Sequence, residues 1–209
     1  MITKICGIQN EDTLVCCEDN SVDFFGMIFY PKSPRNISIK DASNLQKKSE
    51  NLNINGVGVF VNKNIEEVKD IINKVKLNFV QLHGLEDEEY IKILKNIGVK
   101  VIKSIPISNK NDLKKINKYN SADYYLFDYK PIKGELPGGN SKSFDWDILK
   151  NFKSNKPWFL SGGVNIQNIQ DILYDINPFG VDLSSGVEKE LGIKDNHTIN
   201  NFIDKLKNA

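Results

Sequence analysis

The chain has 209 residues, 40% of them hydrophobic and 26% charged, which is the composition of an ordinary globular protein with a sizeable core. A formal net charge of +1 gives no field to attract nucleic acid, and no apolar run reaches the roughly 20 residues needed to cross a bilayer. Three cysteines, two of them adjacent, make a poor disulfide framework, and no secretory leader is recognisable, so we expect a cytoplasmic protein.

Short β-favouring runs alternate with longer amphipathic segments along the whole chain, with about 25 residues per pair. The predicted strands are residues 3–6, 22–30, 56–61, 79–83, 99–105, 123–128, 157–162 and 180–185. The clearest predicted helices are residues 65–75, 87–98, 166–176 and 198–209, and Gly98 suits the end of the second of them. A further helix is expected to begin near Asp145.

Eight such pairs predict parallel strands joined by crossover helices, which close into a single (β/α)8 barrel. A doubly wound open sheet is the alternative, but the glycine loop that usually marks its nucleotide site is missing. We therefore expect residues 1–209 to form one barrel domain. The sequence contains no metal-binding or cofactor motif and only two histidines, so we expect neither a metal nor a cofactor.

In a barrel of this kind, the chemistry lies at the C-terminal ends of the strands. Nearly all reactive or backbone-permissive residue types of this chain follow a predicted strand. They are Cys6, Arg35, His83, Asp128, Gly162, Gly163, Asp182, Ser184, Ser185 and Gly186.

Arg35 is the only arginine beside 27 lysines. A guanidinium binds a carboxylate or a phosphate through two parallel hydrogen bonds, which an ammonium group cannot do. The alternative is that Arg35 lies on a solvated loop and has no specific role there. For Gly162 and Gly163 a tight strand–helix turn is possible, but together with the "DLSSGVE" loop they favour a phosphate cradle.

Cys6 could act as a base or nucleophile, although a buried cysteine usually packs as a small hydrophobic residue, as we expect for Cys16 and Cys17. Asp128 could be a general acid or could cap a helix, and His83 is more often a hydrogen-bonded rim residue than a catalyst. The loop at 129–143 has the glycine and proline content of a flap that closes over a ligand, or of a passive surface loop.

Several stretches together resemble the phosphoribosylanthranilate isomerase family, which makes an Amadori rearrangement in tryptophan biosynthesis. They are "KICGIQNEDTL", "FFGMIFYPKSPRNIS", "GVFVN", "VQLHG", the "FD" of the sixth strand, "GG" followed by "FDW", "LSGGVN" and "VDLSSGVE…GIKD". The "KICG", "YPKSPR" and "VQLHG" motifs are the most specific of these.

The resemblance implies that Cys6 is the base, Asp128 the acid and Arg35 the ligand of the anthranilate carboxylate. It places the phosphate near Gly162, Gly163, Ser184 and Ser185, and we also expect His83, Asp182 and Gly186 to bind the substrate. The implied partner is a small molecule, with no nucleic acid and no membrane, and the protein would be a monomer or a homodimer. Asn140 and Ser141, in the loop at 129–143, depart from the family's usual glycine-rich run.

Two other functions are compatible with such a barrel. One is another phosphosugar enzyme, such as indole-glycerol-phosphate synthase or a different aldose–ketose isomerase, for which Lys103 is the only similar catalytic candidate. The other is a barrel that binds a phosphorylated ligand without converting it. The presence of both Cys6 and Asp128 argues against the second.

Overall fold

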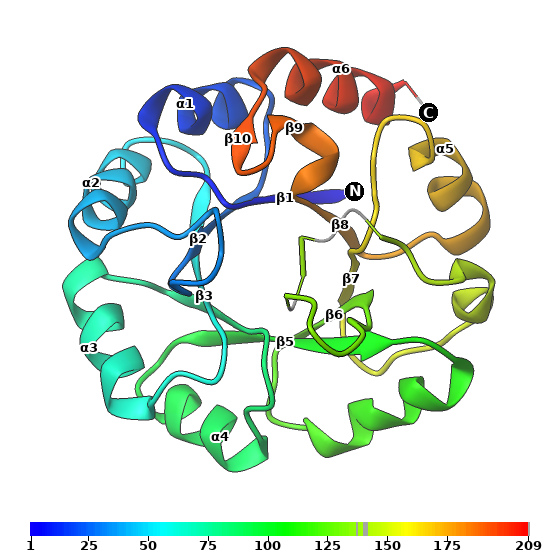
Figure 1. Cartoon of the computed structure of the whole chain (residues 1–209), viewed down its shortest axis with the longest axis horizontal. Coiled ribbons are helices and arrows are strands. Elements are labelled where there is room, and N and C mark those ends of the chain that lie inside the picture. Colours follow the sequence, from blue (N-terminus) through cyan, green and yellow to red (C-terminus); the bar gives the residue numbers. More distant parts are fainter. Residues whose placement is uncertain (137, 140–141, 209) are drawn as a thin grey trace.

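Eight parallel strands close into a barrel in the order in which they occur in the sequence, and β1 pairs with both β2 and β8. Figure 1, a view of the computed structural model, shows the helices as a ring around this barrel. The structure describes residues 1–136, 138–139 and 142–208. The strands are β1 (Ile2–Cys6), β2 (Phe24–Ile28), β3 (Asn55–Phe60), β4 (Phe79–Leu82), β5 (Lys100–Ile107), β6 (Tyr124–Tyr129), β7 (Trp158–Leu160) and β8 (Gly180–Leu183).

The α-helices lie outside the barrel, and helical segments follow each barrel strand. They are the α-helices α1 (Glu11–Asp19), α2 (Ile39–Ser49), α3 (Ile65–Val75), α4 (Glu88–Asn96), α5 (Ile169–Asp171) and α6 (Asn196–Lys207), the 3-10 helices η1 (Lys110–Lys118), η2 (Trp146–Leu149) and η4 (Ser185–Val187), and the π-helical turn η3 (Ile172–Ile176). Asn10, Ser38, Asn64 and Asp87 cap the first four α-helices, each accepting a hydrogen bond from a backbone N–H of the first turn.

The predicted barrel is confirmed, and α3 begins and ends at the predicted residues. The helix predicted for 166–176 is confirmed over Ile169–Ile176, but it begins three residues later, and it is α-helical only over Ile169–Asp171 and π-helical over Ile172–Ile176. The segment that begins after Asp145 is a short 3-10 helix. The predicted eighth strand is too long, because the chain leaves the sheet at Ser184 to enter η4.

A short antiparallel ribbon, β9 (Glu188–Glu190) and β10 (Ile193–Lys194), was not predicted and lies beyond η4.

The apolar core has two parts, one between the helices and the barrel and one inside the barrel. The inner part fills the end of the barrel at which the strands begin, with Phe24, Val57, Ile102, Leu126 and Phe159. Successive side chains of a strand point to opposite faces, so the residues two positions further along also point inward. Apolar packing at one end thus leaves the inward positions at the other end for polar side chains.

None of the helices among the described residues is both long and apolar enough to span a membrane.

Candidate active site

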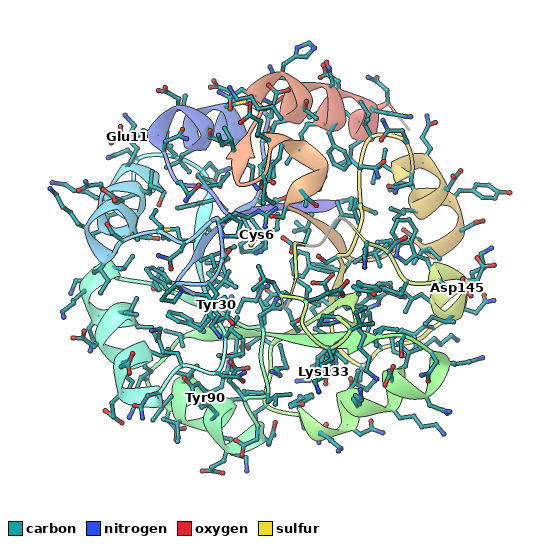
Figure 2. The ribbon with its side chains drawn as sticks, in the orientation of Figure 1. Cys6, Glu11, Tyr30, Tyr90, Lys133 and Asp145 are labelled. Atoms are coloured by element: carbon teal, nitrogen blue, oxygen red, sulfur yellow. The ribbon has the colours of Figure 1, made fainter. Side chains whose placement is uncertain are left out.

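Cys6 is the last residue of β1 and lines a cavity at the mouth of the barrel together with Asp128, the fifth residue of β6. Figure 2 shows Cys6 and Tyr30 toward the centre of the ring, whereas Glu11 and Asp145 lie at its periphery. We call the cavity that Cys6 and Asp128 line the carboxylate-side cavity. The other residues around it are Ile28, Tyr30, Ser33, Arg35, Val59, Val61, Gln81, His83, Leu136, Gly138, Gly139, Ser161, Asp182 and Ser184.

Burial raises the pKa of the Cys6 thiol above its ordinary value of 9.0, while the ammonium group of Lys4 opposes this increase. Asp182 raises the pKa further and Lys194 lowers it. Lys4 is completely buried, and its Nζ lies 2.8 Å from Asp182 Oδ1. The pKa of Lys4 is lowered by burial, but Asp182 and Cys6 raise it by more, so it ends above 10.5. The thiol therefore lies beside a permanent positive charge.

Asp128 is buried, and its two carboxyl oxygens have different partners. Oδ1 accepts a hydrogen bond of 2.8 Å from the Tyr129 backbone N–H. Oδ2 lies 3.1 Å from His83 Nε2, and the other ring nitrogen, Nδ1, lies 2.8 Å from Gln81 Nε2. Two separate contacts thus fix the orientation of the carboxyl group. Its Oδ2 is linked through His83 to Gln81 of β4.

Arg35 is also buried, and Glu188 of the β9–β10 ribbon binds its guanidinium through both carboxylate oxygens. The distances are 2.6 Å from Nε and 2.8 Å from Nη2. Lys194 Nζ lies 2.5 Å from the same carboxylate, and these two cations hold the pKa of Glu188 down at about 2 although its burial acts in the opposite direction. The Nη1 group of Arg35 has no hydrogen-bond partner among the described residues, so it can still meet a ligand carboxylate.

Gly162 and Gly163 follow β7 and line a second cavity, which adjoins the first. Their φ angles of 82° and 80° lie in the left-handed region that favours glycine. A Cβ atom on Gly162 would lie only 2.9 Å from Asp128 Oδ1 and from the Tyr129 backbone nitrogen. The remaining residues around this glycine-side cavity are Asp128, Tyr129, Gly138, Gly139, Lys142, Ser161, Val164, Asp182, Ser184, Ser185 and Gly186.

The loop after β6 turns inward over the mouth of the barrel (Figure 1). A Cβ atom on Gly138 would lie 2.8 Å from His83 Nε2, and one on Gly139 would lie 2.4 Å from Arg35 Nη1. This close approach explains why the loop needs glycine there. Asn140 and Ser141, at which the sequence departs from the family it resembles, lie outside the described residues.

All ten predicted site residues surround these two cavities, and six residues line both of them, including Asp128, Asp182 and Ser184. Lys103 is different: it lies inside β5, completely buried, and its Nζ binds Glu86 at 2.9 Å and the carbonyl of Gly84 at 2.7 Å. It therefore lies within its strand and lines neither cavity.

Sequence reasoning missed Lys4, Gln81, Glu188 and Lys194. A signal existed for each. Lys4 and Gln81 are polar residues in the middle of predicted strands, and Glu188 and Lys194 belong to the "VE…GIKD" motif. The partner of Lys4 could not be predicted, because it is distant in sequence. Lys4 meets Asp182 only because β1 pairs with β8 when the barrel closes.

The model of the N-(5'-phosphoribosyl)anthranilate isomerase family matches residues 3–205. An N-(5'-phosphoribosyl)anthranilate isomerase from Clostridium acetobutylicum is 39% identical over 206 residues, which is 98% of this chain and 97% of the relative. The solved structure of the Thermotoga maritima phosphoribosyl anthranilate isomerase is 34% identical, with a TM-score of 0.89 and complete coverage of both chains. Another solved isomerase of this name, with a TM-score of 0.85, 34% identity and complete coverage, is a complex with reduced 1-(o-carboxyphenylamino)-1-deoxyribulose 5-phosphate. From its barrel, its motifs and these full-length matches, the chain belongs to the N-(5'-phosphoribosyl)anthranilate isomerase family.

Proposed function

We propose that Cys6 and Asp128 are the base and the acid with which this chain carries out the isomerisation of its family. The activity itself follows from family membership: N-(5'-phosphoribosyl)anthranilate becomes 1-(2-carboxyphenylamino)-1-deoxyribulose 5-phosphate in the synthesis of tryptophan. The observation that carries the assignment is that the thiol from β1 and the carboxyl group from β6 line one cavity. A base and an acid on different strands can then act on different atoms of one bound sugar.

The reaction begins with proton transfer from Asp128 to the ring oxygen of the ribose. The C1′–O bond breaks while the nitrogen lone pair forms a C=N bond, which leaves a protonated Schiff base. The positive nitrogen acidifies the C2′ proton, and the Cys6 thiolate removes it. The resulting enolamine gains a proton at C1′ as its 2′-hydroxyl loses one, so the product is a ketone. Cys6 then releases the proton it has gained to solvent and Asp128 regains one from solvent, which closes the proton balance of the enzyme. The substrate nitrogen serves as the electron sink, and the step needs no metal or redox cofactor.

The two ends of the substrate carry negative charge, and each cavity offers a matching group. In the carboxylate-side cavity, Nη1 of Arg35 is available for the anthranilate carboxylate, while Glu188 holds the rest of the guanidinium in one orientation. In the glycine-side cavity, Gly162, Gly163 and the turn at Ser184–Ser185 leave room for a phosphate close to the backbone. We place His83, Asp182 and Gly186 in the lining that surrounds the bound sugar.

We also propose that the chain is one domain, because the barrel and its helices extend from Ile2 to Lys207. Three free, buried thiols support a cytoplasmic location. A solved Thermotoga maritima relative is described as monomers made from a dimeric enzyme, so both a monomer and a homodimer are compatible with the family.

The direct test is turnover of phosphoribosylanthranilate, whose fluorescence is lost as it is consumed, together with growth of a tryptophan auxotroph that lacks this isomerase. We expect both for the wild-type chain. With folded Asp128→Asn protein we expect kcat to fall by at least about 100-fold, because a positioned acid is lost. An unchanged rate in that variant would assign the acid to another group.

A further inference from the structure

Gln81 of β4 is almost completely buried, and its carboxamide oxygen has no hydrogen-bond partner among the described residues. The carboxamide nitrogen of the same side chain lies 2.8 Å from His83 Nδ1. His83 Nε2 in turn lies 3.1 Å from Asp128 Oδ2. A carboxamide, an imidazole and the acid are therefore connected in one line, and a partnerless oxygen lies at its far end. Nothing in the reaction as derived above uses Gln81.

The acid's proton has only one place in this arrangement. Asp128 Oδ1 already accepts the Tyr129 N–H, so a proton on the carboxyl group belongs on Oδ2, which faces His83. His83 Nε2 must then accept a hydrogen bond, because two hydrogens cannot share the space between these atoms. A neutral imidazole that accepts at Nε2 carries its own hydrogen on Nδ1.

The hydrogen on Nδ1 needs an acceptor, and the carboxamide of Gln81 provides one only if its oxygen faces the ring. The oxygen and nitrogen of a carboxamide occupy nearly the same space, so a half-turn of the group exchanges them without displacing other atoms. With Asp128 ionised, the opposite arrangement is correct: Nε2–H donates to Oδ2, and Gln81 donates to Nδ1. Both arrangements contain the same number of hydrogen bonds.

We infer that Gln81 is a positioning residue that lets His83 change its tautomer with the protonation state of Asp128, and so keeps the acid's proton on Oδ2 before the sugar ring opens. This inference rests on the proposed role of Asp128 as the acid. In the protonated state, His83 holds its hydrogen on Nδ1 and Gln81 Oε1 accepts it. After the proton has passed to the substrate, His83 releases its Nδ1 proton to water and takes up a proton from water at Nε2. The carboxamide turns, so that its nitrogen donates to Nδ1.

Other ionisable groups surround this line and are common to every variant compared below. Those that line the same two cavities are Cys6 of β1, Tyr30 and Arg35 of the β2–α2 loop, Tyr129 of β6, Lys142 after β6 and Asp182 of β8. Behind the line, Lys103 and Glu86 are buried and pair with each other. A difference between wild type and a Gln81 variant therefore reports on Gln81 itself.

The decisive measurement is the ¹⁵N spectrum of the imidazole rings as a function of pH, which distinguishes the two tautomers and the imidazolium ion. The chain has only two histidines, and the variant His197→Gln identifies the signal of His83 without touching the site. We expect the spectrum to pass from the Nδ1–H tautomer to the Nε2–H tautomer as the pH is raised. A single tautomer throughout, or an imidazolium with both nitrogens protonated, would overturn the inference. Because this readout needs no substrate, it stands even if the proposed activity fails.

The variant Gln81→Met keeps the volume of the side chain but removes its donor and acceptor. We expect kcat to fall roughly tenfold or more, with the alkaline limb of the kcat profile at lower pH and KM little changed. Gln46→Met is the matched control. Gln46 is another buried glutamine whose oxygen has no hydrogen-bond partner within the described part of the chain, and it lies on α2, outside both cavities. A rise in KM alone, with the pH profile unchanged, would make Gln81 a substrate ligand and would refute the positioning role.

Discussion

Cys6 combines two properties that a simple core cysteine does not have: it is buried, and two ammonium groups, from Lys4 and Lys194, act on it. Replacing its sulfur with oxygen in Cys6→Ser leaves the packing nearly intact but raises the pKa of the proton acceptor by several units. We expect kcat to fall by at least about 100-fold while the unfolding midpoint changes little. Cys16→Ser is the control, since Cys16 lies on α1 and contacts Asn200 outside the site. Near-normal turnover in Cys6→Ser would remove this residue from the reaction.

The raised pKa of the Cys6 thiol also predicts the direction of the pH dependence. Only the thiolate is a base, so kcat/KM should rise as the pH increases toward the thiol's pKa above 9.0. Lys4→Met removes the cation that favours the thiolate and leaves Asp182, which disfavours it, without its partner. Both changes raise the thiol's pKa.

We therefore expect the ascending limb of kcat/KM in Lys4→Met to move to higher pH by roughly one unit or more. Lys207→Met, at an exposed position on α6, should leave the limb in place. A shift toward lower pH, or none at all, would show that Lys4 does not act on the base.

Among the structural elements, the turn after β7 allows the effect of backbone strain on stability to be distinguished from an effect on catalysis. Gly162 and Gly98 both have positive φ angles, 82° and 88°, so an alanine at either position costs about 1–2 kcal/mol of stability. They differ in surroundings: a Cβ on Gly98 meets nothing within 4 Å, whereas one on Gly162 would press on the Asp128 carboxyl group. We expect Gly98→Ala to lose only this strain energy in urea unfolding. Gly162→Ala should lose more stability, because its Cβ would also press on the Tyr129 backbone nitrogen, and it alone should lose kcat. Equal kcat in the two variants would show that the position of the Asp128 side chain is not critical.

The β9–β10 ribbon is connected to the β2–α2 loop through Glu188, Arg35 and Lys194. The folded pKa of Glu188, about 2, lies below the ordinary value of 4.5, so the carboxylate stabilises the fold fully above pH 4.5 and loses this effect as the pH falls toward 2. The shift corresponds to about 3 kcal/mol. We expect Glu188→Gln to be destabilised by this order of magnitude at pH 7, and the difference from wild type to shrink at pH 2–3. A difference independent of pH would attribute the loss to packing instead.

The helices and strands that could be predicted are those whose formation depends on residues close together in the sequence. In α3, Ile65, Val68 and Ile72 form an apolar stripe that is visible in the sequence, and the helix was predicted residue for residue. The Lys110–Lys118 segment has no such stripe, and its Asp112 turns back to bind the Ser108 N–H and hydroxyl, which favours a tighter 3-10 turn.

The residues of the site also fall into a part that could be predicted from the sequence and a part that could not. Strand ends and glycines could be found from their place in the chain, whereas the pairing of Arg35 with Glu188 joins residues 153 positions apart and depends on the closed barrel. The same is true of the line from Gln81 of β4 through His83, just after that strand, to Asp128 of β6.

At the scale of the whole molecule, closure of the barrel brings β8 beside β1 and so places the glycine-side cavity next to the thiol. The substrate's two anionic ends then have separate sites, with the reacting carbons between them. Separate sites should accept the two ends as separate molecules. We therefore expect inorganic phosphate and anthranilate to inhibit independently, each without excluding the other.

Arg35→Lys tests this division, because it keeps the charge but loses the fork of donors. We expect the inhibition constant of anthranilate to rise about tenfold, corresponding to about 1.4 kcal/mol, and that of inorganic phosphate to stay nearly constant, since the phosphate is held at the other cavity. The reverse exchange on the same loop, Lys32→Arg, is a suitable control because Lys32 is exposed and should affect neither ligand. Equal weakening of both ligands would mean that the two cavities act as one site. Unchanged anthranilate inhibition would limit Arg35 to its pairing with Glu188, and the substrate carboxylate would then need another partner.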